Sequence, residues 1–480
     1  MSVCDFMILD QPLKYFTHKI CIYLNLVTIV FRCYCFYVTI ISQINKVSLI
    51  IKTMHMNRVY LLLIFLLFHQ VNYSQTITYQ DRTYDENIQT VLCYRTGNQL
   101  NEPIIRLNSN EKLRLSFDDL SDESYRFKYT IIHCNEFWEP SDLTQIEYIE
   151  GYFEEEILDY YFSLNAIPGY IHYTHVFPTP NMRIKRSGNY LLKVYLDNPG
   201  DENVLFTKRF YVVEQLIRVE ASIPYYPKNL IFTRKKQQID IRLFTPDLFN
   251  AEPQQRVSLT LQQNGRWDNA KMGIKATSIM MNELQYNYPE GIVFDGGNQY
   301  RNFDMKSFVY QSMYIKRIVS DKEGYIVVLH TDYSKAKKPY ETIADIHGKK
   351  LIRARSDQVT MIEGEYALVQ FTLKHPKIEN ADIYIVGALN NWQLDELSKM
   401  RFSSSTKQYY GQLILKQGYY DYHYVVVPRG SNVGDVTVIE GDNWQSKNTY
   451  SAFIYYREKV PEYDRLVGYQ KFSSFEISIK

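Results

Sequence analysis

The sequence predicts an all-β protein built from three packed β-sandwich domains. Short runs in which apolar and polar residues alternate recur along the chain, and turn residues separate them. The 43 tyrosines and 25 phenylalanines favour pleated, half-buried surfaces. A length of 480 residues exceeds what one hydrophobic core usually organises. We therefore expect domains at residues 76–215, 216–360 and 361–480.

The first domain is predicted from a series of short strands. They are expected at residues 88–95, 103–107, 112–117, 125–133, 171–177, 187–196 and 204–213. The last two form a hairpin across the turn Asn198-Pro199-Gly200. Residues 153–162 are ambiguous, because their apolar side chains are spaced for one face of a helix whereas their aromatic rings favour a strand. The triplet Glu154-Glu155-Glu156 is expected to face solvent.

The second domain is predicted from strands that lie at residues 238–244, 256–264, 307–318 and 325–333. A long irregular piece separates the second of these strands from the third and contains Trp267, Pro289 and Gly296-Gly297. Loops of that length in a compact domain tend to be functional surfaces. We therefore expect this piece to lie at the surface of the domain.

The third domain is organised around the stretch from Ala381 to Val427. A strand with a two-residue period ends at Gly387, and a turn at Asn390-Asn391 leads to Trp392. The spacing resembles the early-set sandwich modules that are linked to starch and glycogen binding. The matching positions are Gly387, Asn390, Trp392, Gly418, Tyr420 and Tyr422. The resemblance implies an early-set, immunoglobulin-like sandwich for this part of the chain.

Trp392 is the residue with a possible ligand role, because aromatic faces bury well against sugar rings. Asn390 and Asn391 beside it are further candidates for contact with a ligand or partner. A single Trp after a turn is more often part of a core, so we expect Trp392 to be mainly structural. A later strand is expected to project Tyr420, Tyr422 and Tyr424 from one face, and Asp421 and His423 from the other.

The N-terminal part of the sequence contains the pattern of an export signal. Residues 56–74 have the three parts of a secretory signal peptide: a basic residue, an apolar run and a small, polar end. Such a segment does not work in the interior of a chain. We therefore expect Met56, or alternatively Met54, to be the true start, and residues 1–55 to be an upstream extension of the reading frame. The competing interpretation is a membrane span at residues 20–41, in which the central Arg32 would cost a few kcal/mol.

Charge and hydropathy argue against nucleic-acid binding and membrane insertion, whereas the cysteine content leaves two alternatives open. The 54 Lys and Arg residues nearly balance the 53 Asp and Glu residues, so charge predicts no nucleic-acid partner and no anionic membrane surface. After Phe68 no window approaches the ~20 apolar residues of a membrane span. We expect an exported protein that is not inserted in the membrane. Cys93 and Cys134 leave open one disulfide or two separate buried thiols.

No set of residues predicts catalysis, a metal site or a cofactor. His133-Cys134-Asn135 lists the residue types of a cysteine hydrolase, but neighbours on a strand point to opposite faces and cannot form a triad by themselves. The adjacent Glu154-Glu155-Glu156 lacks the opposed carboxylates of a glycosidase. Gly296-Gly297 has no phosphate-loop context, and the ten His residues show no metal-binding spacing. We expect no enzyme activity and no small-molecule substrate.

Long collinear segments carry a resemblance to a known family. They are LSFDDL at 115–120, YTIIHCNEFWEPSDL at 129–143, EYIEGYFEEEILDYYFSLNA at 147–166, SGNYLLKVY at 187–195, QQNGRWDN at 262–269, NQYRNFD at 298–304, KQGYYDYHY at 416–424, and NTYSAFIYYRE with DRLVGY at the end. Through them the chain from Asn87 to Tyr469 resembles the plug proteins of the type IX secretion system. Within the shared motifs, the residues expected to be structural are His133, Cys134, Asn135, Trp138, Ser187, Gly188, Asn189 and Tyr190.

The resemblance implies a periplasmic protein without enzyme activity at the inner face of the outer membrane. It would cap the periplasmic mouth of the very large outer-membrane β-barrel translocon that exports folded cargo. A barrel that wide would leak small molecules if it stood open, so a gate is physically required. Two other interpretations remain: a periplasmic carbohydrate-binding protein that would use Trp392, and a scaffold for envelope assembly that involves no pore.

Overall fold

The computed structural model describes residues 77–121, 123–197, 203–245, 252–280, 282–320, 322, 324–354 and 360–474. The predicted signal peptide at 56–74, both candidate start residues and the turn at 198–200 lie outside these described residues. Within them the prediction of an all-β protein is confirmed, because short helical turns only connect strands. None of the helices in this part of the chain combines the length and apolar character that a membrane crossing requires.

The first sandwich consists of two sheets around one core. One sheet has the order β1 (Arg82–Thr83), β12 (Val204–Val213), β11 (Gly188–Leu196), β5 (Phe127–Cys134) and β7 (Glu154–Ile157), with β3 (Ile104–Arg106) beside β12. The other has the order β2 (Ile88–Arg95), β4 (Leu113–Asp119), β9 (Ile171–Phe177) and β8 (Asp159–Phe162). Phe117 from one sheet and Tyr129 and Phe206 from the other share a core, as the two-residue period of these strands predicts.

The ambiguous residues 153–162 form strands and not a helix. β7 pairs with β5, and β8 pairs with β9. Leu158 alone joins β7 to β8, so the chain passes from one sheet to the other at this edge of the sandwich. Glu154 and Glu156 are exposed, as expected. Glu155 is half-buried and accepts a hydrogen bond from the Thr179 hydroxyl at 2.8 Å.

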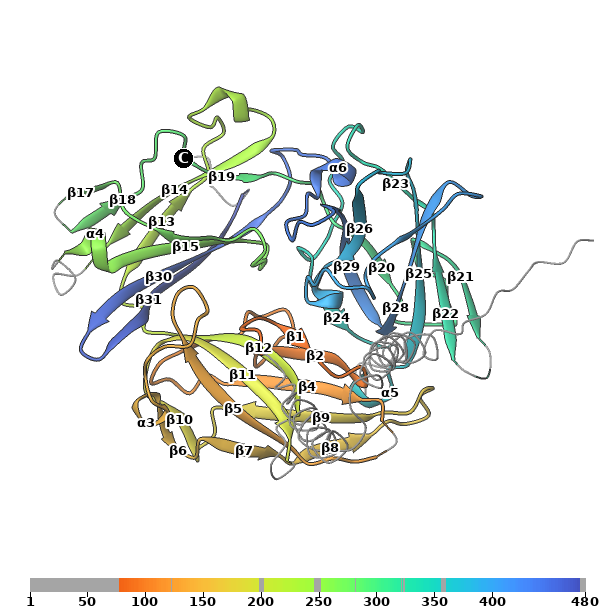
Figure 1. The fold of residues 1–480 in the computed structure, drawn as a ribbon, viewed down its shortest axis with the longest axis horizontal. Coiled ribbons are helices and arrows are strands. Elements are labelled where there is room, and N and C mark those ends of the chain that lie inside the picture. Colours follow the sequence, from red (N-terminus) through yellow and green to blue (C-terminus); the bar gives the residue numbers. More distant parts are fainter. Residues whose placement is uncertain are drawn as a thin grey trace, which may run out of the picture. The chain divides into compact units, whose positions relative to one another are not determined.

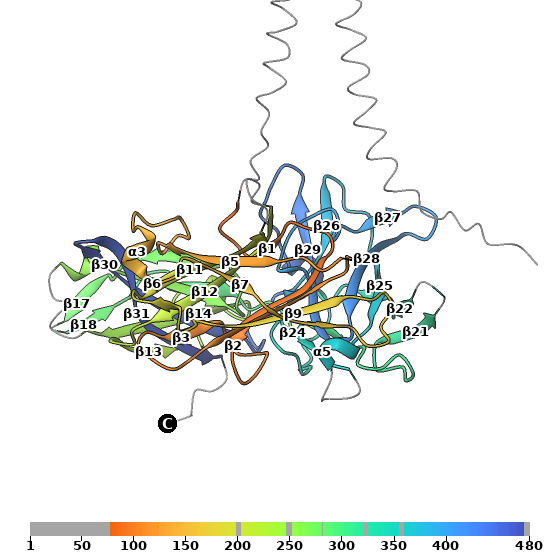
Figure 2. The ribbon, with the colours of Figure 1, turned by 90° about the horizontal axis from the view of Figure 1, so that it is seen from below.

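A second core joins strands from the middle of the chain to its last hairpin. One of its sheets has the order β13 (Arg218–Ser222), β14 (Lys236–Phe244), β18 (Glu283–Gln285) and β17 (Ser278–Met280), with β19 (Ile292–Asp295) beside β14. The other has the order β16 (Lys271–Ile274), β15 (Val257–Gln263), β30 (Thr449–Lys459) and β31 (Glu462–Ser473). Leu259 on β15 lies opposite Ile454 on β30. Figure 1 shows the blue hairpin β30–β31 beside the green strand β15, and Figure 2 again places the hairpin among these strands.

A third core lies between two further sheets. One contains β20 (Arg301–Asp304), β29 (Gly418–Pro428) and β24 (Lys350–Ile352), with β26 (Ala381–Val386) beside β29. The other has the order β21 (Ile315–Ser320), β22 (Tyr325–Leu329), β25 (Tyr366–Lys374), β28 (Gln408–Lys416) and β27 (Arg401–Ser403), with β23 (Asp332–Tyr333) beside β25. Phe303, Val327 and Phe371 are among the buried residues that fill this core.

Strand pairing crosses the predicted boundary at residue 360 in both directions. β20 to β24 precede this residue but belong to the third core, whereas β30 and β31 follow it but complete the second core. The division at residues 215 and 360 stays a prediction, and the hydrophobic cores that the structure shows are not contiguous in sequence. The strand predicted at 307–318 begins only at Ile315.

Candidate functional site

Two motif segments that are far apart in sequence lie side by side in the first sandwich. Strand β5, which ends in His133-Cys134, pairs antiparallel with β11, which begins after Ser187. The register places Asn189 opposite Cys134 and Tyr190 opposite His133. The side chains of His133, Cys134, Ser187, Asn189 and Tyr190 are all buried. These segments therefore form one cluster, which we call the β5–β11 cluster.

His133 is a buried residue with both ring nitrogens in hydrogen bonds. Its Nε2 lies 3.1 Å from the carbonyl oxygen of Ser187, and its Nδ1 lies 2.8 Å from the hydroxyl of Ser141. A carbonyl oxygen only accepts, so Nε2 carries the proton and Nδ1 accepts from the hydroxyl. Burial lowers the pKa of His133 to about 4. The neutral imidazole is therefore held as a structural bridge between β5 and the start of β11.

Cys134 points away from His133 into a different set of apolar residues. It packs with Leu191 and Phe453, and burial raises its pKa to about 12. Burial likewise raises the pKa of Cys93 to about 12. Both cysteines are free thiols in the structure, which favours the second of the two alternatives left open by the sequence. A thiol that stays protonated is a poor nucleophile, and strand geometry separates it from the imidazole.

Asn135 and Trp138 shape the turn that follows β5. The side-chain oxygen of Asn135 accepts hydrogen bonds from the backbone N–H groups of Phe137 and Glu139, each at 2.9 Å. This bonding supports a left-handed backbone at Trp138, whose φ is 67°. The indole is thereby directed inward, where its ring lies 5.4 Å from that of Tyr211 in an edge-to-face contact. In this arrangement both motif residues make contacts that shape the turn.

Residues on the β11 side of the cluster form hydrogen bonds with the last hairpin, β30–β31. Ser187 donates to Glu214 at 2.6 Å, and Arg465 on β31 binds the same carboxylate at 2.8 and 3.0 Å. Asn189 accepts a hydrogen bond from the hydroxyl of Tyr455 on β30 at 2.8 Å. The motif thus connects the first sandwich with the hairpin that completes the second core.

The turn before Trp392 is built by Asn390. Its side chain accepts from the N–H of Gly387 at 3.2 Å and donates to the carbonyl oxygen of Gln393 at 2.8 Å. Asn391 lies at a left-handed position, with φ of 53°, and accepts from the ammonium group of Lys208 at 2.9 Å. Asn390 therefore supports the fold locally, whereas Asn391 ties the third core to the first sandwich.

Trp392 is half-buried and is surrounded by the chain's own side chains. The guanidinium of Arg266 lies over its ring at 4.7 Å, and the ring of Tyr300 meets it edge-on at 6.0 Å. A Cβ added at Gly348 would lie only 2.6 Å from the indole, so the backbone there approaches the ring closely. These contacts cover much of the surface that a sugar would need.

Three of the four tryptophans of the chain line one cleft. Trp138, Trp267 and Trp392 come from three distant segments and, with other residues, line an open cleft of ≈ 240 Å³. Arg209 occupies the space between two of them, because its guanidinium lies 4.3 Å from the ring of Trp138 and 5.0 Å from that of Trp267. Arginine over a Trp face is a favourable cation–π contact. The arrangement stabilises the meeting point of the three segments.

A buried ionic cluster joins the first sandwich to the third core. Asp118 on β4 accepts hydrogen bonds from Lys416 on β28, His172 on β9 and the hydroxyl of Tyr366 on β25, each at 2.6 Å. Although burial opposes ionisation, the charge of Lys416 lowers the pKa of Asp118. Sequence reasoning missed this cluster, because the strand predicted at residues 112–117 stops just before Asp118. A signal was present, because Asp118 directly follows the apolar alternation of β4.

A second buried ionic cluster explains the tyrosine face of β29. Arg301 binds Asp332 at 2.7 Å and the fully buried Glu440 at 3.0 Å. The hydroxyls of Tyr422 and Tyr424 donate to Asp332 at 2.7 and 2.8 Å. Every charged group of this cluster therefore has a partner, which is the arrangement that makes buried charges tolerable.

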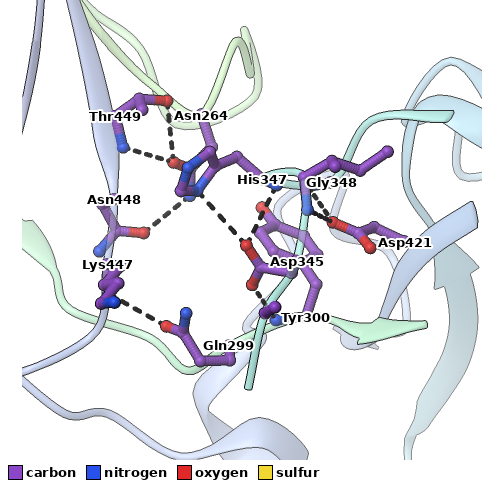
Figure 3. A network of polar contacts seen from close by, with 12 residues as sticks. Asn264, Gln299, Tyr300, Asp345, His347, Gly348, Asp421, Lys447, Asn448 and Thr449 are labelled. Atoms are coloured by element: carbon purple, nitrogen blue, oxygen red, sulfur yellow. Dashed lines mark hydrogen bonds and ion pairs between the residues drawn. The ribbon is translucent and has the colours of Figure 1, made fainter. Parts of the chain in front are cut away.

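The opposite face of β29 is also buried, which the alternation of its residues does not reveal. Asp421 accepts hydrogen bonds from the backbone N–H groups of Ile346 and Gly348 at 2.7 and 3.0 Å, as Figure 3 shows for Gly348. Burial and the charge of Asp345 raise the pKa of Asp421 to about 8. Burial also holds the pKa of His423 well below its usual range. Asp421 thus anchors a loop by hydrogen bonds and not by charge.

The residues of these clusters connect strands that are distant in sequence. Within the described ranges, no group of three or more His, Cys, Asp or Glu residues is placed to hold a metal ion. The charged side chains of the two ionic clusters make hydrogen bonds that connect elements distant in sequence. The arrangement fixes the first sandwich to the third core and to the last hairpin, which is part of the second core.

Comparisons with known proteins identify relatives of the chain. Residues 88–214 match the family model described as the type 9 secretion system plug protein 1st domain. A crystal structure of a hypothetical protein from Parabacteroides merdae ATCC 43184 is 33% identical, with a TM-score of 0.79, and the match covers 83% of this chain and 100% of that one. No curated protein matches the sequence significantly.

Two other solved structures show much weaker similarity. The C-terminal domain of the AgI/II polypeptide BspA from Streptococcus agalactiae is 9% identical, with a TM-score of 0.12 over 80% of this chain and 97% of that one. Dimeric latent PorU from Porphyromonas gingivalis is 10% identical, with a TM-score of 0.14 over 80% of this chain and 34% of that one.

Proposed function

This chain belongs to the plug protein family of the type IX secretion system, and from this premise we propose that it closes the periplasmic opening of the giant outer-membrane β-barrel translocon. A role in type IX secretion follows from the family itself. The observation that carries the proposal is the match of residues 88–214 to the plug domain, together with a relative aligned over its whole length. A pore that passes folded cargo needs a gate when no cargo is present.

The contacts between the cores support a gate that acts as a rigid body. Asp118 and Lys416 join the first sandwich to the third core, and Asn189 and Tyr455 join it to the last hairpin. Breaking a buried ion pair by losing one partner costs about 3–5 kcal/mol. A body whose cores are joined in this way resists deformation when it covers an opening.

The proposed location is the periplasm, at the inner face of the outer membrane. The signal-like segment at residues 56–74 supports export, and the partner would be the translocon barrel. We also propose that the protein has no enzyme activity, nucleic-acid partner or small-molecule substrate. Replacing Cys134→Ser or His133→Gln should then affect function only through stability. A folded Cys134→Ser protein that loses function would contradict this part of the proposal.

A pull-down from outer-membrane extracts tests the proposed partner. The full chain with a C-terminal affinity tag should recover the giant barrel, which mass spectrometry identifies by its peptides. A tagged exported protein of unrelated fold serves as the control and should recover no barrel. Recovery of other envelope proteins without the barrel would instead favour the interpretation as an assembly scaffold.

Carbohydrate binding remains the second candidate function. Its support is the cleft that Trp138, Trp267 and Trp392 line. Arg266 and Arg209 already lie over the tryptophan rings, which weakens this candidate. Retention of the protein on immobilised glycans, and loss of that retention on Trp392→Ala substitution, would favour carbohydrate binding over occlusion.

A further inference from the structure

The first sandwich carries a strip of exposed apolar side chains along one edge. The strip, which we call the aromatic edge, spans residues 146–167. Its most prominent side chains belong to Tyr152, Leu158, Tyr160, Tyr161, Phe162 and Leu164, which are between 47% and 71% exposed. Single exposed apolar side chains are common on soluble proteins, but a contiguous group of them typically marks an interaction site.

The backbone of the aromatic edge also presents unpaired strand groups. β8 is the outermost strand of its sheet, and β7 is the outermost strand of the facing sheet. Among the described residues, no strand pairs with the outer side of β8. Soluble proteins usually protect such edges with charged side chains such as lysine, with proline, with a bulge or by keeping the strand short. β8 is four residues long and begins with Asp159, but it contains no lysine or proline, and its pairing with β9 is regular.

The charge of the aromatic edge restricts what can cover it. Residues 146–167 contain six carboxylates and no lysine or arginine. Glu154 is paired with Lys128 at 3.1 Å. Glu156 and Asp159 are exposed and form no ion pair within the described part of the chain. A basic partner would therefore be attracted, whereas a second copy of the same edge or an anionic membrane surface would be repelled.

We propose that β8 is the docking strand of this protein. Its occupant is an extended segment of the translocon barrel that exposes lysine or arginine among apolar residues and adds to β8 as a further strand. Backbone hydrogen bonds along a free edge supply affinity in this recognition mode, and side-chain contacts supply specificity. Here Leu158 and Phe162 provide apolar contact, and Glu156 and Asp159 provide the acidic groups. The inference rests on the proposed function, because that function supplies the barrel as partner.

Two double variants of the full chain test the docking strand. Leu158→Ser with Phe162→Ser removes apolar contact, and Glu156→Lys with Asp159→Lys reverses the charge. The matched control is Leu230→Ser with Ile231→Ser, because these residues are 75% and 80% exposed but lie outside the aromatic edge. We expect each edge variant to recover at least about tenfold less barrel per molecule of bait, because substitutions of central interface residues typically weaken binding by this much. The control should recover as much as the wild type, and all melting temperatures should agree.

A photo-activated cross-linker placed at residue 162 identifies the occupant, with residue 231 as the control position. The expected product joins residue 162 to a peptide of the barrel that contains lysine or arginine. Cross-links only to lipid or to a second copy would overturn the inference. Equal recovery of barrel by the wild type and both edge variants would overturn it while leaving the proposed function intact. A wild-type protein that recovers no barrel would overturn both.

Discussion

Gly188 shows how a single backbone position supports the β5–β11 cluster. Its φ is +145°, a conformation that other residues rarely adopt, and an added Cβ would lie 2.4 Å from Nε2 of His133. The same Cβ would lie 3.1 Å from the carbonyl oxygen of Asp464 on β31. A side chain at this position must therefore displace both the bridging imidazole and the last hairpin.

We predict that Gly188→Ala lowers the free energy of unfolding by more than the ~1–3 kcal/mol that backbone strain alone costs. Gly430→Ala is the matched control, because Gly430 also has a positive φ, +81°, but open space around it. Chemical denaturation measures both variants. Equal losses in the two would show that the contact with His133 does not matter.

The raised pKa of Asp421 predicts how the free energy of unfolding depends on pH. Its pKa is about 8 in the folded protein and 3.8 ordinarily. Between these values the folded state binds more protons than the unfolded state, so the free energy of unfolding falls as pH rises from about 4 to 8. The slope from this one group is at most about 1.4 kcal/mol per pH unit.

Asp421→Asn should remove this contribution while its side-chain oxygen still accepts from Ile346 and Gly348. The difference in unfolding free energy between the variant and the wild type should therefore change between pH 5 and 8. The expected change favours the variant as pH rises. Parallel curves for the two proteins across this range would refute the raised pKa.

At the scale of elements, the ion pair of Asp118 and Lys416 couples β4 of the first sandwich to β28 of the third core. Both side chains are almost fully buried. We predict that Lys416→Met costs about 3–5 kcal/mol, because it leaves a buried carboxylate without its main counter-charge. Asp118→Asn combined with Lys416→Met should cost clearly less, because neither charge remains. A double variant as unstable as the single one would contradict this interpretation.

The last hairpin gives a second prediction at this scale. The core around β14 and β15 needs Tyr450, Ile454 and Val467 from that hairpin. Residues 216–360 alone should therefore fail to unfold cooperatively. A fragment in which residues 216–297 are joined to residues 443–474 should instead unfold cooperatively. The linker between the two pieces can be short, because the N–H of Asn443 donates to the carbonyl oxygen of Gly297 at 2.9 Å. Circular dichroism melts compare the two fragments, and cooperative melting of the first would support a contiguous domain.

For the whole molecule, occlusion predicts a leak when the protein is absent. Deleting its gene should raise outer-membrane permeability to large antibiotics, because barrels without their periplasmic partner would stand open. Deleting the barrel as well should restore the barrier, which serves as the control. Uptake of a large antibiotic or fluorescent dye measures the effect. Unchanged permeability in the single deletion would refute the gate.

The sequence by itself determined the all-β class, many of the individual strands and the resemblance to the family. Alternation at Phe127, Tyr129 and Ile131 predicts β5, because a strand exposes successive side chains to opposite sides. It could not place β15 beside β30, since pairing between segments that are distant in sequence depends on complementary surfaces and not on local pattern. Nor could it show that β31 exists, because its residues carry many polar groups.

Only the tertiary structure decided what the motif residues do. His133 and Ser187 become neighbours because β5 pairs with β11. Asp421 is buried because a loop covers the second face of β29. The exposure of Phe162 likewise follows from its place on an edge strand and not from its type. In each case burial and hydrogen bonding depend on which surfaces meet, and that is fixed by free-energy terms that sum over the whole chain.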